Sequence, residues 1–338
     1  MRSSRKPLPF RRWLPGLSFA LALAGAPGLA TSVQAAPQVI KIGWTTADSP
    51  SDPYAITAHY FAEALEKNVP GHFKVQFYGG HQLGDEMQML QGLQLGTLDM
   101  GVITGTVIGN LIPSYQLNDL PFLYKSNEQA HRVLDGKAGD ILTEDLKAKK
   151  VTNLGFAEAG FRHVINNTRP IAIPDDLKGI RLRVQPSDMF IDSFRALGAN
   201  PVPLPWGDAF TAVQQGTIDG LEIPLAVIYA NKFPEVTRHL SLTRHSYNAL
   251  ALLISDRTLG KMDAATQEQV RKAARDAITR QRATMAESDT EILDKIRDAG
   301  MQVNEVPDLT IFRDMESSVY DKYRATIGAQ VLEAALGD

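Results

Sequence analysis

Arg183 is the residue in this sequence whose type and setting point most directly to binding chemistry. It lies in the segment "GIRLRV", where the alternation of Ile180, Leu182 and Val184 predicts a strand with one apolar face. Arg183 then lies on the opposite face, and a guanidinium presents two parallel N–H donors that match a carboxylate. The residue is therefore a candidate carboxylate receptor. The alternative is an exposed strand face, as for its neighbour Arg181.

Motifs of common catalytic chemistry are missing from the chain. There is no G-x-S-x-G elbow, the seven histidines show no H-E-x-x-H spacing, and no pair of acids stands out as an acid/base couple. The absence of cysteine excludes disulfides, thiolate metal sites and a cysteine nucleophile. We therefore predict that the protein is not an enzyme and uses no cofactor or metal. An exported hydrolase is the enzyme alternative.

One phrase occurs twice: "QLGTLDMG" at 94–101 and "QQGTIDGL" at 214–221 share Gln, Gly, Thr and Asp at the same four positions. Gly96 and Gly216 stand where a left-handed glycine would end a helix. We expect Asp99 and Asp219 to tie down turn backbone rather than to perform chemistry. Each copy thus predicts a helix end, a glycine cap and a strand start, in two lobes of similar construction.

The surrounding elements follow the same α/β pattern in both halves. Strands are predicted at 39–44, 73–78 and 98–104, with helices from Pro53 to about 69 and over 84–96. This βαβαβ order is typical of a parallel sheet covered by helices. The second half repeats it, with strands at 179–184, 200–204 and 217–223 and helices near 190–197 and over 208–216.

Residues 263–299 contain neither proline nor glycine and predict the longest helix, about 50 Å at 1.5 Å per residue. Such a helix exceeds the width of one lobe, so we expect it to span both. The alternative is two helices with a break near Glu287 and Ser288.

The first 35 residues have the pattern of a signal peptide. Five Lys and Arg without any acid precede an apolar stretch from about 14 to 30, and "SVQAAP" ends in a small-residue cleavage site. We predict cleavage near Ala35 and, in a bacterium with two membranes, a periplasmic protein. An uncleaved membrane anchor is the alternative. Export by the general or the twin-arginine route is left open by Arg11 and Arg12.

Charge argues against one class of partner. The chain has 35 Lys and Arg against 38 Asp and Glu, and five of those cations lie in the first 35 residues. Residues 36–338 therefore carry 30 cations against 38 acids, a net charge of −8. A nucleic acid is not an expected partner, because binding a phosphate backbone requires positive charge.

Three segments in register resemble the extracytoplasmic solute-binding proteins of tripartite ATP-independent periplasmic (TRAP) transporters. They are "GGHQLGDEMQMLQGLQLGTLDMG", "IPDDLKGIRLRV" and "LGANPVPLPWGDAFTAVQQGTIDGLEIP". The resemblance implies an α/β periplasmic binding protein fold of two lobes, each a mixed sheet flanked by helices, with crossing strands and a long helix. It also implies a monomer that closes around an organic acid and then docks onto a membrane permease. An exported sensory protein that binds the same ligand is the alternative.

The resemblance suggests lobe boundaries, with the ligand cleft between the lobes. The first lobe comprises 36–158 and about 248–285, and the second comprises 159–247 and about 286–338. In open α/β sheets, ligands bind beyond the carboxyl ends of the strands, which agrees with such a cleft.

Individual residues inherit roles from the resemblance. Arg183 occupies the family position that receives the ligand carboxylate, and Arg162 in "EAGFRHVINN" matches one that assists with ligand oxygens. Trp206, which we place in a loop, lies where the family sets an aromatic ring against the ligand. Glu222 is expected to line the site, either receiving a ligand hydroxyl or anchoring a neighbour.

Three further positions complete the candidate site. Thr45 and Thr104 match positions that often contact ligand in relatives. Ile223 is a departure, because many relatives that bind sugar acids or C4-dicarboxylates have asparagine there. Its apolar side chain argues against sialic acid and a plain dicarboxylate and favours a ligand with an apolar portion. Relatives that bind 2-oxoacids through a metal generally have tryptophan at this position, so a metal is not expected.

Overall fold

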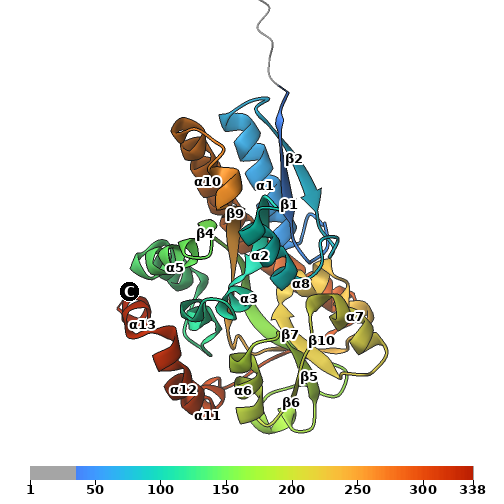
Figure 1. Cartoon of the computed structure of the whole chain (residues 1–338). Helices are drawn as coiled ribbons and strands as arrows, with labels where there is room; N and C mark the ends of the chain where they lie inside the picture. The colour runs from blue at the N-terminus through green and yellow to red at the C-terminus, as the bar shows by residue number, and fades with distance from the viewer. Residues whose placement is uncertain (1–35, 338) are drawn as a thin grey trace, which may run out of the picture. The chain divides into compact units, whose positions relative to one another are not determined.

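A computed structural model describes residues 36–337, so the predicted signal peptide lies outside the described residues. This part of the chain contains a ten-stranded sheet with helices on its faces (Figure 1). The strands are β1 (Gln38–Gly43), β2 (Phe73–Tyr78), β3 (Met100–Thr104), β4 (Val151–Asn166), β5 (Arg181–Val184), β6 (Asn200–Pro203), β7 (Gly220–Pro224), β8 (His239–Leu242), β9 (Tyr247–Ser255) and β10 (Gln302–Glu305).

The helices fall into a set between the strands and a set at the C-terminus. They are α1 (Pro53–Asn68), α2 (Glu86–Leu95), α3 (Gly105–Gly109), η1 (Pro113–Asp119), α4 (Asn127–Asp135), α5 (Lys137–Lys147), η2 (Pro174–Leu177), α6 (Asp188–Ala196), α7 (Trp206–Gln214), α8 (Leu225–Ala230), η3 (Phe233–Glu235), α9 (Asp256–Leu259), α10 (Ala264–Asp298), α11 (Thr310–Met315), α12 (Ser317–Ile327) and α13 (Ala329–Leu336).

The two predicted βαβαβ units are present and have the same strand order. In the first, β1 pairs in parallel with both β2 and β3. In the second, β5 pairs in parallel with both β6 and β7. The first strand of each unit is therefore central, as right-handed crossovers through the intervening helices require. The predicted α/β construction of both halves is confirmed.

The repeated phrase performs the same structural task twice. Gly96 and Gly216 have φ angles of 72° and 68°, the left-handed conformation expected after a helix. The Asp99 carboxylate accepts a hydrogen bond from the backbone N–H of Lys41 in β1 (2.9 Å), and the Asp219 carboxylate accepts one from Arg181 in β5 (2.8 Å). Each aspartate ties its turn to the neighbouring parallel strand, which confirms its structural role.

β4 connects the two units by changing partners along its length. Residues 151–161 pair with β9, whereas 162–166 pair with β7 and β8. Bulges interrupt the pairing with β9 between Asn153 and Phe156 and between Glu158 and Gly160, and bulges increase local twist. Arg162 is the first residue of β4 to face β7, so it lies at the junction of the two units.

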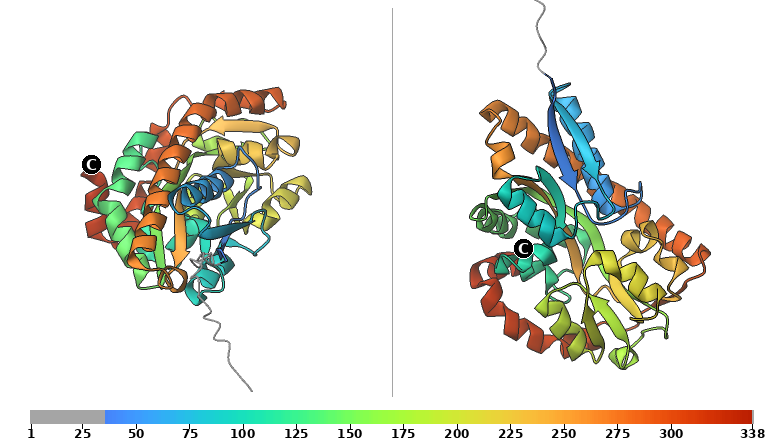
Figure 2. Two further views of the ribbon diagram at one scale, coloured as in Figure 1. Left: turned by 90° about the horizontal axis from the view of Figure 1, so that it is seen from above. Right: turned by 45° about the vertical axis from the view of Figure 1, so that its right-hand side comes forward.

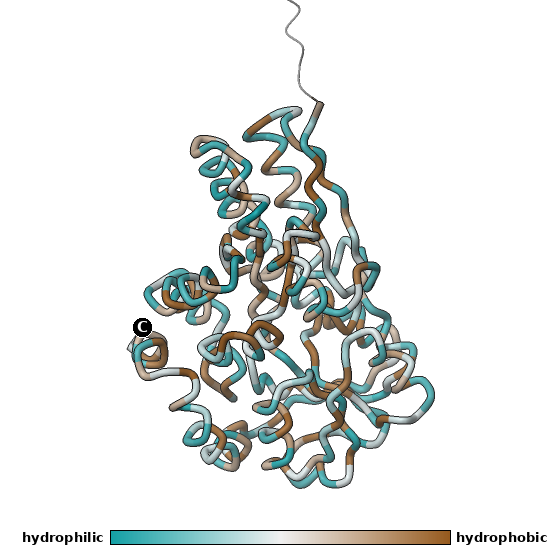
Figure 3. Tube along the Cα trace, in the orientation of Figure 1, coloured by the Kyte–Doolittle hydropathy of each residue, from teal (hydrophilic) through white to brown (hydrophobic). Residues whose placement is uncertain are grey.

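The long helix α10 is continuous over 35 residues, so the alternative of a break near 287–288 does not hold. It packs against α1 of the first unit, against β4, and against α8, which follows β7 of the second unit (Figure 2). Hydrophilic and hydrophobic residues alternate along it, as expected for a helix with one buried face (Figure 3). On the buried face of α10, the Gln281 amide forms two hydrogen bonds with the backbone of Glu158 in β4. It donates to the carbonyl oxygen (2.6 Å) and accepts from the N–H (3.2 Å).

The C-terminal helices follow β10, in the segment 286–338 that we expect to belong to the second lobe. β10 does pair with β8 of the second unit. However, α13 packs against α5 and α12 against η1, and their apolar residues share one cluster with those of α4 and α5. Val319, Tyr323 and Ile327 form an apolar stripe at four-residue spacing, which needs an apolar surface to cover it. Residues 317–336 therefore contact elements of both expected lobes, because α12 also packs against α6, where Lys322 and Tyr323 contact Asp192.

Candidate functional site

A cavity of about 290 Å³ lies between the two units, at the carboxyl ends of their strands. One side comes from the segment after β1 and the starts of α1 and α2, and the other from β5, β7, the start of α7 and α8. Residues of the crossing strands β4 and β9 also reach it. The lining residues are Thr45, Thr46, Tyr54, Asp85, Glu86, Met87, Val107, Asn110, Arg162, Arg183, Gln185, Pro186, Pro205, Trp206, Ile223, Pro224, Val227 and Asn248.

Arg183 is a buried cation whose charged end has no anionic partner. Its side chain lines the cavity although the residue is only 3 % exposed, and its Nε donates to the carbonyl oxygen of Leu204 (2.9 Å). Among residues 36–337, its two terminal nitrogens have no hydrogen-bond or ion-pair partner. Burial lowers the pKa of Arg183 to about 10, so it still carries its charge at neutral pH. An unpaired charge of this kind is costly unless an anion fills the cavity.

Arg162 differs because protein groups already occupy its N–H donors. It is ion-paired with Glu222 through Nε and through Nη2 (2.8 Å), and its Nη1 donates to Asn248 Oδ1 (3.0 Å). When the Gln185 amide is oriented to satisfy its neighbours, its oxygen accepts from Nη1 (2.8 Å) and Nη2 (3.1 Å). Burial alone would lower the pKa of Arg162, but Glu222 outweighs it and raises that pKa. Arg162 thus lines the cavity with few donors to spare.

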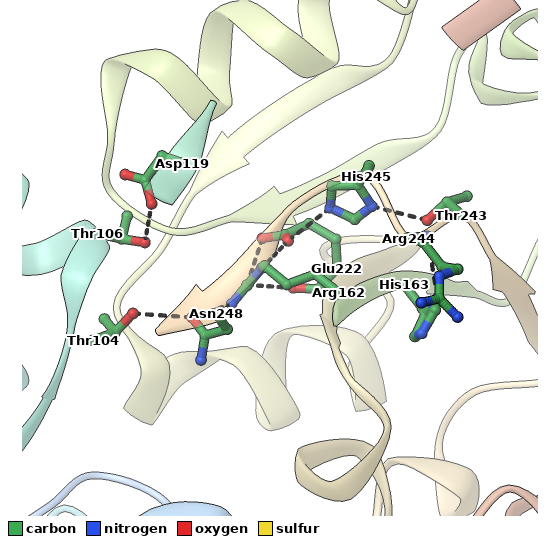
Figure 4. Close-up of polar contacts among 10 residues, drawn as sticks. All are labelled: Thr104, Thr106, Asp119, Arg162, His163, Glu222, Thr243, Arg244, His245 and Asn248. Carbon is green, nitrogen blue, oxygen red and sulfur yellow. Dashed lines mark hydrogen bonds and ion pairs between the residues drawn. The ribbon is translucent and has the colours of Figure 1, made fainter. Parts of the chain in front are cut away.

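Glu222 lies behind the cavity wall and anchors Arg162, one of the two roles expected for it. Its carboxylate is fully buried and also accepts from His245 Nε2 (3.2 Å), while His245 Nδ1 accepts from Thr243 Oγ1 (2.8 Å; Figure 4). Burial lowers the pKa of His245, so the imidazole is neutral and can donate at Nε2 and accept at Nδ1. Burial opposes ionisation of Glu222, but Arg162 and His245 hold its pKa below the ordinary value.

The apolar part of the wall contains two of the predicted residues. Trp206 is the first residue of α7 rather than part of a loop, and the Arg183 guanidinium lies 5.8 Å from the centre of its ring. Ile223 in β7 lines the cavity beside Pro224 and Val227. The cavity therefore combines a cationic end with an aliphatic and aromatic wall.

The two predicted threonines differ in their position relative to the cavity. Thr45 lines the cavity, directly after β1. Thr104 is not among the lining residues, because its side chain points to the β9 strand and its Oγ1 donates to Asn248 Oδ1 (3.0 Å; Figure 4). It therefore contacts the cavity only through Asn248.

Sequence reasoning did not identify most of the lining residues, among them the polar residues Tyr54, Glu86 and Asn248. Burial raises the pKa of Glu86 to about 7, and its Oε1 accepts from the backbone N–H of Thr104 (2.9 Å). In the sequence, Glu86 is one of the acids expected in the first turn of a helix. Asn248 was the better signal, because it is the lone amide in the apolar strand "YNALALLIS".

No helix within residues 36–337 is both long and apolar enough to cross a membrane. Nor do the described residues contain a cluster of three or more histidine and acidic side chains that could hold a metal ion. The cavity that contains Arg183 combines one strong anion receptor with an apolar wall.

Comparison with known proteins identifies the class as solute-binding receptors. Residues 45–326 match the DctP family, described as bacterial extracellular solute-binding protein family 7. A periplasmic protein of Escherichia coli that binds 2,3-diketo-L-gulonate, YiaO, is 34% identical over 95% of this chain and 98% of its own length. The chain therefore belongs to family 7 of the bacterial extracellular solute-binding proteins.

Two solved structures of TRAP periplasmic or sugar acid binding proteins share the fold. One, from a Polaromonas species with bound D-erythronate, has a TM-score of 0.85 and 33% identity, covering 88% of this chain and 98% of that one. The other, the sugar acid binding protein DctPAm of Advenella mimigardefordensis with galactonate, has a TM-score of 0.86 and 31% identity, covering 89% and 97%. The predicted family and its two-lobed α/β fold are thus confirmed.

Proposed function

We propose that this protein captures a small organic acid in the periplasm and delivers it to the membrane permease of a TRAP transporter, without chemical change to the ligand. The observation that carries this proposal is Arg183, a buried and charged guanidinium that faces a cavity without an anionic partner. The periplasmic relatives and the neighbours that hold D-erythronate and galactonate support the ligand class.

The binding mechanism follows from the arrangement of the wall. The ligand carboxylate accepts two parallel hydrogen bonds from the terminal nitrogens of Arg183, whose position is fixed by Leu204 and Trp206. Arg162 lies beside this receptor and is held by Glu222. Exclusion of water on binding strengthens these charge-assisted bonds, because the local dielectric constant falls. The ligand body packs against Trp206 and Ile223.

We further propose that the two units close on the ligand as lobes, with β4, β9 and α10 as the connections. The cavity draws residues from both units, so a ligand that contacts both favours the closed arrangement. The closed form is then the form that docks onto the permease. We propose the lobe boundaries expected from the sequence, with 317–336 in contact with both lobes through α5, η1 and α6.

A thermal-shift screen of residues 36–338 tests the proposal. The protein is first unfolded and refolded to remove co-purified ligand, then mixed with aldonates, uronates, hydroxy acids and branched or aromatic 2-substituted acids. A ligand at 100 times its dissociation constant adds about 2.7 kcal/mol, which shifts Tm by several degrees. Each hit is repeated with its neutral alcohol analogue, which should produce no shift. If no acid raises Tm, or if the neutral analogues raise Tm equally, the proposal is overturned.

A further inference from the structure

A second cavity, of about 260 Å³, has a wall of cations and aromatic rings. Lys125 comes from the segment before α4, Arg244 from the turn between β8 and β9, and Arg313 from α11. Phe122, Tyr124 and Phe161 supply the aromatic surface, and the cavity shares no lining residue with the cavity that contains Arg183. Three segments that are far apart in the sequence therefore bring three positive charges to one hollow.

The three cations of this second cavity are exposed side chains. None of its lining residues is an acid. Within the described part of the chain, the side chains of Lys125 and Arg244 form no ion pair, and Arg313 meets only its neighbour Asp314, at 3.6 Å, where both are exposed. Exposed pairs of this kind contribute little. Asp308, next to the lining residue Leu309, accepts a hydrogen bond from the Thr310 N–H (2.8 Å), and Asp289 on α10 senses the charge of Arg244 without pairing with it.

This cluster also runs against the charge of the protein. Residues 36–338 carry 30 cations against 38 acids, so three cations without an acid among them are a local exception. Like charges repel, and an arrangement that holds them together is stabilised by an anion between them.

The backbone at the cavity is held in an uncommon conformation. Arg244 and Phe122 have φ angles of 44° and 54°, a region that favours glycine and asparagine. The Phe122 N–H donates to the carbonyl oxygen of His245 (2.8 Å), and the Arg244 guanidinium lies 4.5 Å from the centre of the Phe161 ring. The wall is thus fixed in place, and an arginine stands where the backbone itself would favour a smaller residue.

We propose that this cavity is a second binding site, for a small anion with more than one carboxylate. The guanidinium groups of Arg244 and Arg313 and the ammonium of Lys125 would meet the carboxylates, and the carbon skeleton would lie against the aromatic rings. Arg244 directly precedes His245, whose imidazole holds Glu222 and through it Arg162. One turn therefore contributes to both cavities.

The test is a calorimetric titration of refolded residues 36–338 with citrate, at constant ionic strength. We expect saturable binding that Arg183→Gln leaves within twofold and that Arg244→Asn weakens at least tenfold. Asparagine suits the left-handed backbone, so this variant removes the charge with the fold kept. Arg324→Gln, which removes an exposed cation of α12 outside the cavity, is the control and should bind as the unmodified protein does.

Three outcomes would overturn the second site: no saturable binding, binding that survives Arg244→Asn, or binding lost in Arg183→Gln. The last would show that citrate enters the cavity of the proposed function instead. The titration with citrate does not require the ligand of the cavity that contains Arg183. If citrate does not bind, the proposed function still stands, and if the thermal-shift screen fails, the second site still stands.

Discussion

Replacing Arg183 by glutamine should lower the affinity for the acid and raise the stability of the ligand-free protein. The substitution keeps a polar side chain of similar length but removes the charge. If Arg183 is the carboxylate receptor, affinity for the acid must fall. If the charge is costly without ligand, the empty protein must become more stable. Damage to an ordinary core residue lowers both, so the opposite signs are diagnostic.

The affinity change follows from the loss of a desolvated charge pair. Truncating one partner of such a pair costs 2–5 kcal/mol, because the other charge is left unpaired in the site. Since 1.4 kcal/mol corresponds to a factor of ten, Kd should rise at least about thirtyfold.

The stability change follows from the pKa of the arginine. Burial lowers that pKa from its ordinary value to about 10, and each pKa unit corresponds to 1.36 kcal/mol, so the fold bears a cost of roughly 3 kcal/mol for the charge. The cost is fully present below pH 10 and falls as the pH rises from 10 towards the ordinary pKa of arginine, because the folded protein then loses the proton before the unfolded chain does. Loss of the hydrogen bond to Leu204 offsets about 1 kcal/mol. The variant should therefore gain about 2 kcal/mol, or roughly 5 °C in Tm.

Denaturant unfolding of the refolded, ligand-free protein measures the stability, and isothermal titration with the acid measures the affinity. Arg181→Gln is the matched control: it lies two residues away on the same strand, but it is 47% exposed and paired with Asp219. It should change stability by less than about 1 kcal/mol and leave the affinity unchanged. If Arg183→Gln is less stable than the parent protein and binds the acid as tightly, Arg183 is not the unpaired carboxylate receptor.

Three further predictions concern the surrounding residues. Burial raises the pKa of Glu86 from its ordinary 4.5 to about 7, so its protonated form is favoured at low pH and gives way to a carboxylate as the pH rises through 7. Because that carboxylate repels the ligand, Kd should rise about tenfold between pH 6 and pH 8. Glu86→Gln should remove this pH dependence. Isothermal titrations at both pH values measure the effect. Glu222→Gln leaves Arg162 as a buried unpaired charge and should cost about 3–5 kcal/mol in urea unfolding; a loss under 1 kcal/mol would show that the pair is not the anchor. Ile223→Asn adds an amide to the apolar wall and should shift the thermal-shift profile towards more polar acids, whereas an unchanged profile would place the residue outside ligand contact.

The local elements could be predicted from the sequence because short-range patterns specify them. Alternating apolar residues marked β1 and β5, and glycine at 96 and 216 marked the helix ends. The same alternation placed Arg183 on the face opposite Leu182, which is the face that reaches the cavity. These features depend on neighbours within a few residues.

The features that were missed depend on contacts between distant segments. The donors of Arg162 are occupied by Glu222 and Asn248, which lie 60 and 86 residues further along the chain. Likewise, the apolar stripe of α12 predicts a buried face but not the surface that covers it, which η1 and α6 provide. Glu86 is an ordinary first-turn acid in the sequence, and its burial becomes apparent only in the folded chain.

A crystal structure of residues 36–338 with the strongest acid of the panel would show whether Arg183 receives the ligand carboxylate. We expect both carboxylate oxygens within about 2.7–2.9 Å of the two terminal nitrogens of Arg183, with the ligand body against Trp206 and Ile223. A carboxylate held by Arg162 or by another group, with the terminal nitrogens of Arg183 unpaired beside the bound ligand, would contradict it.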